Sequence, residues 1–209
     1  MSSARPWNLR SCRVNLSPLY EAAQEHVAHE WQANNFWVAV LEAWAFQNNV
    51  AVHTKSQAAP DPDPASREKL HRVDFLLSVY ELQRGFREIP LIFVEGKGHY
   101  ASKEEQEKVE GQGFDACQSY IQSRRNSINR ISCLCTVGTK ARAFEYKLGI
   151  RGNYVWTAMW GKDGDVDFKE YIDAGDQNSI TIWKALDSIL TSSGIQAATP
   201  AEIYVEDAI

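Results

Sequence analysis

The hydrophobic and polar positions at the start of the chain predict two helices. Ser17-Pro18 places an N-cap residue before a proline in the first turn, which predicts a helix to about residue 31. A second helix is predicted from Asn34 or Asn35 to about Gln47, where almost every residue is apolar. A helix with so little polar surface is expected to be largely buried.

The pattern after residue 50 predicts short strands around one long helix. A strand at 50–55 precedes a proline-rich surface loop at 58–66. A strand at 90–100 contains Leu91-Ile92-Phe93-Val94 and is apolar on both faces, as a central strand is. The other predicted elements are a strand at 72–82, a polar helix at 102–122, strands at 131–137, 142–147 and 154–160, and a helix at 179–190. Three successive strands followed by a helix exclude a simple doubly wound alternation.

Length and composition predict one globular domain over residues 1–209. The chain is 44% hydrophobic and 23% charged, which is ordinary for a globular protein. No apolar run is long enough to cross a bilayer, and no apolar stretch follows the N-terminal arginines as in a secretory signal. The four cysteines show no C-x-x-C spacing and are interpreted as reduced, buried thiols. We therefore expect an intracellular protein, cytoplasmic or nuclear, with no membrane partner.

The charge is unevenly distributed along the chain. A net charge of −5 argues against a general nucleic-acid binder, which usually carries a basic excess. Residues 124–151, however, contain a single acid, Glu145, and seven basic residues: Arg124, Arg125, Arg130, Lys140, Arg142, Lys147 and Arg151. This segment is either a phosphate-binding surface or an ordinary solvated face.

Three charged residues in the predicted strands form the candidate site. Glu95 and Lys97 alternate with Gly96, so they face the same side of a strand that is otherwise apolar. Gly96 removes a side chain between them and permits close backbone approach. Asp74 would lie beside Glu95 if the two strands pair, and two adjacent carboxylates favour a divalent cation between them. Oxygen ligands suit Mg²⁺ or Mn²⁺ better than zinc.

Glu42 is a further candidate ligand. It is the only acidic or permanently charged residue between Trp31 and Thr54, in the middle of the apolar helix. A lone carboxylate on a helix expected to be buried needs a partner, and the same metal would be one. The alternative is an ion pair with a core arginine or histidine. Asp74 could likewise cap a turn next to Arg72, and Glu95 with Lys97 could form a solvated strand edge.

An aspartate on one strand, Glu-x-Lys on the next and a following helix with glutamine resemble the PD-(D/E)XK nuclease superfamily. The resemblance covers about residues 34–147. It implies a restriction-endonuclease-like α/β fold, with a mixed central sheet flanked by helices and the core order α-β-β-β-α-β. An N-terminal helix and a C-terminal strand and helix would extend this core. Val73 stands where the family often has proline, and Asp61 and Asp63 do follow prolines but lie in the predicted loop.

The resemblance also implies a mechanism and a substrate. Asp74, Glu95 and Glu42 would hold Mg²⁺ or Mn²⁺, and Lys97 would complete the catalytic set with Asp74 and Glu95. The family's helix glutamine would be Gln112 or Gln118, and His99 could line the same face. Nucleic acid, DNA favoured over RNA, would be bound by Gln112, Arg124, Arg125, Lys140 and Arg142. A homodimer is compatible with this interpretation.

Two other functions remain open from the sequence. The chain could keep the nuclease fold without the reaction and serve as an interaction or structural module, as its acidic composition and lack of an appended DNA-binding domain would allow. It could also be an enzyme that uses the same site on a small molecule.

Overall fold

The computed structural model describes residues 16–25, 29–48, 50–58, 73–81, 87–123, 129–149, 152–163 and 168–193. The helices are α1 (Ser17–Gln24), α2 (Glu30–Gln47), α3 (Lys103–Ser123) and α4 (Ile180–Ser192), with short 3₁₀ turns at Phe168–Glu170 and Gln177–Ser179. The strands are β1 (Val52–Ala58), β2 (Val73–Glu81), β3 (Arg87–Lys97), β4 (Arg130–Val137), β5 (Lys140–Leu148), β6 (Tyr154–Ala158) and β7 (Ile172–Asp173).

The strands form one mixed sheet in the order β1-β2-β3-β4-β5-β6, and β7 pairs with β5. β3 and β4 run parallel, and α3 connects them; the other neighbouring strands in this described sheet are antiparallel. A parallel pair needs a long crossover, which α3 supplies. The α/β class predicted from the sequence is therefore confirmed. From α2 to β4 the chain runs helix, three strands, helix, strand.

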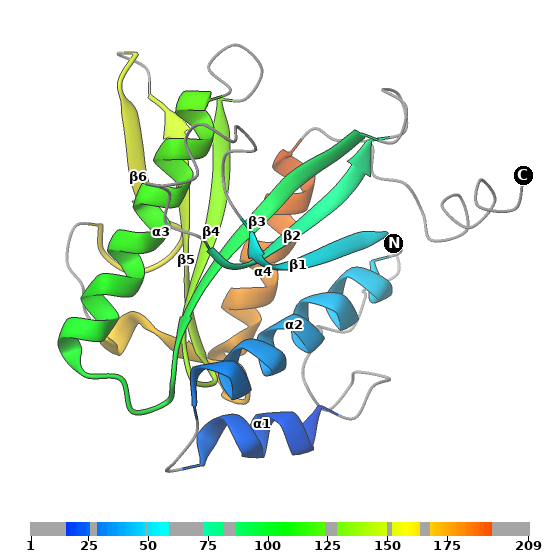
Figure 1. Ribbon diagram of the computed structural model, residues 1–209, viewed down its shortest axis with the longest axis vertical. Coiled ribbons are helices and arrows are strands. Elements are labelled where there is room, and N and C mark those ends of the chain that lie inside the picture. The colour runs from blue at the N-terminus through cyan, green and yellow to red at the C-terminus, as the bar shows by residue number, and fades with distance from the viewer. Residues whose placement is uncertain are drawn as a thin grey trace, which may run out of the picture.

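Helices cover both faces of the sheet (Figure 1). One core cluster joins α2 and α4 to one face, with Trp37, Trp44 and Trp183 among its largest side chains. A second cluster packs α3 against the other face around Phe93 and Tyr120. α1 lies beside α2. Because β3 and β4 contribute to both clusters, the central strand character predicted for 91–94 is confirmed.

The boundary between the first two helices differs from the sequence prediction. α1 ends at Gln24 rather than near residue 31, and α2 begins at Glu30 rather than at Asn34. The start of α2 is fixed by His29, whose backbone N–H donates to the Gln32 side chain at 2.6 Å. Such a contact satisfies a backbone donor at a helix start, where no earlier carbonyl is available. The consequence is that Glu30 and Asn34 lie in the first two turns of α2.

Other elements begin and end close to their predicted positions. Ser102 and Glu105 form a reciprocal capping box that starts α3, with contacts of 2.7 and 3.3 Å. β3 is longer than predicted at its start and ends at Lys97. Pro90 sits in β3 where the register against β2 shifts, so its missing N–H falls at an irregular point of the ladder. Within the described ranges, no helix is both long enough and apolar enough to cross a bilayer.

Candidate metal site at the end of β3

The pairing of β2 with β3 brings the two predicted carboxylates together. Phe75 lies opposite Val94 in this antiparallel pair, and the next step of the register places Asp74 opposite Glu95. The backbone N–H of Gly96 donates to Asp74 Oδ2 at 2.7 Å, which fixes Asp74 at the end of β3. The expectation that Asp74 lies beside Glu95 therefore holds in the structure.

Glu95 is a buried carboxyl group that lacks a full set of partners. Its residue is only 2% exposed, and its Oε1 accepts no hydrogen bond from the described part of the chain. Burial raises the pKa of Glu95 to about 9; the neighbouring Cys133 and Asp74 add to the rise, and the charge of Lys97 opposes it. The ionised form is therefore unfavourable here unless a positive charge arrives.

Asp74 lies in the same electrostatic setting but accepts a hydrogen bond from the backbone N–H of Gly96. Burial raises the pKa of Asp74, and the charge of Glu30 acts in the same direction. The Gly96 N–H, the charge of Lys97 and a side-chain hydrogen bond from Asn34 oppose the rise. Asp74 is thus easier to ionise than Glu95 and is the better first ligand for a cation.

Lys97 is held in place by an acid from α2. Its Nζ lies 2.9 Å from Glu30 Oε2, and the side chains are 19% and 44% exposed. Burial lowers the pKa of Lys97, but the hydrogen bond and charge of Glu30 and the charges of Asp74 and Glu95 outweigh it, so the net pKa is raised. Lys97 therefore remains an ammonium group across the neutral pH range.

The sequence prediction placed the wrong helix acid at this site. Glu42 is exposed, accepts a hydrogen bond from Thr54 Oγ1 at 2.8 Å, and lies three turns beyond Glu30, about 18 Å along α2. The prediction that Glu42 binds the metal is therefore wrong, because it sits on the solvent face of α2. Glu30 and Asn34 reach the site instead. The signal that could have found them is the His29–Gln32 capping pair, which starts the helix at Glu30.

The glutamine and histidine candidates are not shown to join the cluster. Gln112 is half-buried on α3, and its Oε1 is buried without a hydrogen-bond partner among the described residues. Gln118 lies nearly two turns further along α3. His99 lies against Gly138 in the turn between β4 and β5 and contacts Tyr100 edge-on.

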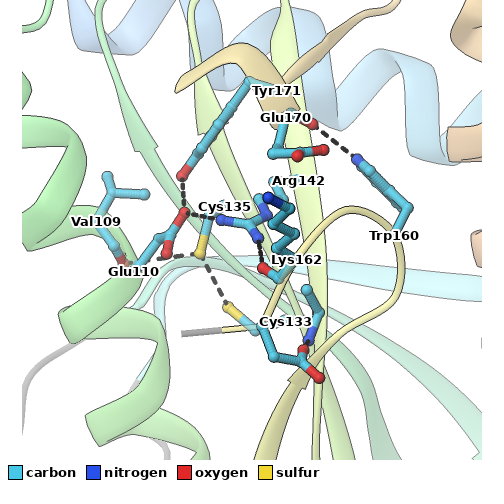
Figure 2. Close-up of polar contacts among 11 residues, drawn as sticks. Val109, Glu110, Cys133, Cys135, Arg142, Trp160, Lys162, Glu170 and Tyr171 are labelled. Atoms are coloured by element: carbon cyan, nitrogen blue, oxygen red, sulfur yellow. Dashed lines mark hydrogen bonds and ion pairs between the residues drawn. The ribbon is translucent and has the colours of Figure 1, made fainter. Parts of the chain in front are cut away.

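The basic residues predicted to bind phosphate lie in different environments. Arg124 and Arg125 lie outside the described residues. Lys140 begins β5 and is half-buried. Arg142 is only 1% exposed and forms an ion pair with Glu110 across 3.2 Å (Figure 2). The prediction that Arg142 contacts substrate is therefore wrong, because α3 covers its face of the sheet and Glu110 neutralises it.

The Arg142 pair belongs to a buried polar network. The hydroxyl of Tyr171 donates to Glu110 Oε1 at 3.0 Å, and Arg142 donates to the carbonyl oxygen of Lys162. Figure 2 shows these groups meeting between α3 and β5. Burial raises the pKa of Glu110, while Arg142 opposes the rise. Because either Arg142 or Glu110 alone would be a buried charge without a counter-charge, the network fixes α3 on the sheet.

The cysteines of the structure are buried free thiols, as predicted. Cys117 lies on the buried side of α3, and Cys133 and Cys135 share the face of β4 beneath it. Cys12 lies outside the described residues. Gly113 of α3 packs so tightly on this cluster that an added Cβ would lie 2.7 Å from Cys133 Sγ.

The residues present fit a sparse magnesium site rather than an all-protein cage. Within the described ranges, no group of three or more His, Cys, Asp or Glu residues could hold a metal ion. Mg²⁺, however, is commonly held by one or two carboxylates together with water and substrate phosphate. Asp74 and Glu95 supply two adjacent carboxylates, and a buried oxygen of Glu95 has no hydrogen-bond partner in the part of the chain that the structure describes.

Comparison with known proteins gives no relative for this chain. No protein-family model matches it, and no curated protein or solved structure shows a significant match.

Proposed function

We propose that this chain is a Mg²⁺- or Mn²⁺-dependent nuclease that hydrolyses phosphodiester bonds, with DNA favoured over RNA as substrate. One observation carries the proposal: a buried carboxyl oxygen of Glu95 has no hydrogen-bond partner among the described residues and lies in the strand pair that holds Asp74. Lys97 follows on the same side of β3. Two carboxylates and an ammonium group at one strand end suit phosphodiester chemistry.

The arrangement of the elements supports a restriction-endonuclease-like fold. The order α2, β1, β2, β3, α3, β4 places three antiparallel strands before a helical crossover and a parallel strand. The candidate residues lie on β2 and on the end of β3, at the edge where the N-terminus of α2 also lies. One fold can host many functions, so the proposed reaction depends on the residues of the site.

Each residue of the cluster has a defined role in the proposed reaction. Asp74 and Glu95 would hold the ion, which, when bound, polarises the phosphate and lowers the pKa of a bound water. Lys97 stabilises the negative charge that develops on the phosphate oxygens. Glu30 positions Lys97 through the 2.9 Å ion pair and keeps it charged. Glu95 gives up its proton when the cation binds.

A second candidate function is a non-catalytic module with the same fold. The observation that favours it is the raised pKa of Glu95, to about 9, which leaves this carboxyl protonated at neutral pH when no cation is present. The engagement of Arg142 with Glu110 also removes one predicted phosphate contact.

A cleavage assay separates the two functions. Wild-type protein would be incubated with single- and double-stranded DNA and RNA in Mg²⁺ or Mn²⁺, beside Lys97→Ala and a chelator control. Lys103→Ala is the matched control, because Lys103 is 80% exposed on α3. We expect cleavage by the wild type and by Lys103→Ala, and loss of cleavage in Lys97→Ala and in chelator. Absence of cleavage by the wild type on every substrate would favour the module.

A further inference from the structure

The main chain of Lys97 is anchored at the point where β3 ends. Lys97 is the last residue of this strand, and Gly98, which follows it, has a freer backbone than any residue with a side chain. The backbone N–H of Gly138 donates to the carbonyl oxygen of Lys97 at 2.9 Å. Gly138 lies in the buried turn between β4 and β5. The main-chain position of Lys97 therefore depends on the conformation of this turn.

The turn at Gly138 is held in turn by a side chain of α2. Trp37 Nε1 donates to the carbonyl oxygen of Gly138 at 2.9 Å, and Trp37 is fully buried. This bond and the bond to Lys97 hold the two peptide units on either side of the Gly138 Cα. If the bond broke, a buried indole N–H and a buried carbonyl would both lose their partner, so breaking it is costly.

Gly138 has the backbone angle and the surroundings that favour glycine. Its φ is 58°, in the left-handed region. A Cβ built on it would lie 2.8 Å from His99 Cα, a main-chain atom, and 2.7 Å from His99 Nδ1. The segment that follows Lys97 is therefore packed directly against Gly138.

The same helix holds the side chain of Lys97. Glu30 Oε2 lies 2.9 Å from Lys97 Nζ. Trp37 is seven residues after Glu30, which places it nearly two turns further along α2 and on the same face. α2 thus fixes Lys97 at two points: its ammonium group through Glu30, and its main chain through Trp37 and Gly138.

We propose that Trp37 and Gly138 are positioning residues for Lys97. Through their two hydrogen bonds they keep the end of β3 where the Lys97 ammonium group can reach the phosphate. The consequence for cleavage rests on the proposed function, while the link from Trp37 through Gly138 to the Lys97 main chain does not.

Amide hydrogen exchange on the metal-free protein tests the link itself. Trp37→Phe removes the indole N–H and leaves an aromatic ring in the core. Trp44→Phe is the matched control, because Trp44 lies on the same helix, is 1% exposed, and donates through Nε1 at 2.9 Å to Asp187 instead. We expect protection of the Gly138 amide, relative to that of Leu134 in β4, to fall about tenfold in Trp37→Phe. The same ratio should stay within about twofold in Trp44→Phe. An unchanged ratio in Trp37→Phe, or an equal fall in both variants, would overturn the inference.

Steady-state cleavage then measures what the link does for the reaction. We expect kcat of Trp37→Phe to fall about tenfold and KM to stay within about twofold, because Lys97 acts on charge that develops in the transition state. Trp44→Phe should keep both constants. An unchanged kcat in Trp37→Phe, or an equal loss in Trp44→Phe, would overturn the role in catalysis.

The two measurements separate this inference from the proposed function. Absence of cleavage by the wild type would overturn the proposed function, and the exchange result would still decide whether Trp37 holds Gly138 and Lys97. If Trp37→Phe does not fold, site-specific replacement of the Trp37 indole by benzothiophene gives the same two measurements, because it keeps the shape and lacks the N–H.

Discussion

The buried carboxyl of Glu95 predicts that the metal-free protein becomes less stable as pH rises. The pKa of Glu95 is about 9 in the folded chain against an ordinary value of 4.5. Between these values the folded state keeps a proton that the unfolded state has lost. The favourable contribution is thus complete below about pH 4.5 and disappears as pH rises through 9.

The perturbation that isolates this effect is Glu95→Gln, which resembles the protonated carboxyl and does not titrate. One proton per molecule corresponds to about 1.4 kcal/mol per pH unit. The unfolding free energy of the wild type minus that of Glu95→Gln should therefore fall by about 1.4 kcal/mol for each unit between pH 5.5 and 8. The full span is on the order of 6 kcal/mol, because Glu95 is only 2% exposed and water cannot screen it.

Urea unfolding of both proteins at pH 5.5, 6.5, 7.5 and 8 gives this difference directly. Subtraction removes the groups that titrate alike in the two proteins. Saturating Mn²⁺ should abolish the decline in the wild type, because a bound cation stabilises the ionised carboxylate. A difference that stays flat without metal would show that Glu95 is already ionised in the folded protein, and would refute the reasoning from burial.

Three further predictions concern neighbouring residues. Glu30→Gln should lower nuclease activity and shift the alkaline limb of its pH profile to lower pH, because the pKa of Lys97 falls. The free energy of unfolding, measured by thermal denaturation, should change by less than about 1 kcal/mol, because the ion pair is half-exposed. Arg142→Ala should cost about 3–5 kcal/mol in urea unfolding, because it leaves Glu110 buried and unpaired, and Arg142→Met combined with Glu110→Gln should cost much less. Gly113→Ala should destabilise by about 1–3 kcal/mol through overpacking on the thiols, against a near-neutral Gly111→Ala, which has open space.

The strand residues of the site could be predicted from the sequence because strand geometry is local. Alternation alone puts Glu95 and Lys97 on one side of β3. That Asp74 lies opposite Glu95 depends on the register of β2 against β3, which the sequence leaves open and the structure supplies. Gly96 is a point of close approach, but the groups nearest to it are the side chains of Asn34 and Thr136 and not the backbone that its position predicted.

The helix residues of the site could not be predicted because they depend on where α2 begins. Starting the helix at Asn34 removed Glu30 from it and left Glu42 as its only acid. A four-residue error in the start of the helix therefore moves the expected helix ligand from the first turn to the middle of the helix. The prediction for Arg142 is wrong for another reason. Its place in a basic stretch predicts an exposed side chain, but Glu110 on α3 gives it a buried partner.

The charge balance of the cluster indicates what it lacks. With Glu95 ionised, three carboxylates (Glu30, Asp74 and Glu95) face a single ammonium, so the group carries a net charge of −2. Lys97 offsets Glu95 only in part, because it also pairs with Glu30 at 2.9 Å. A protein without a cation must therefore keep Glu95 protonated. A divalent ion would neutralise the cluster and supply the buried Oε1 of Glu95 with a partner. A neutral isostere would serve a purely structural module better, so a cation is the simplest physical reason for a carboxyl group at this position.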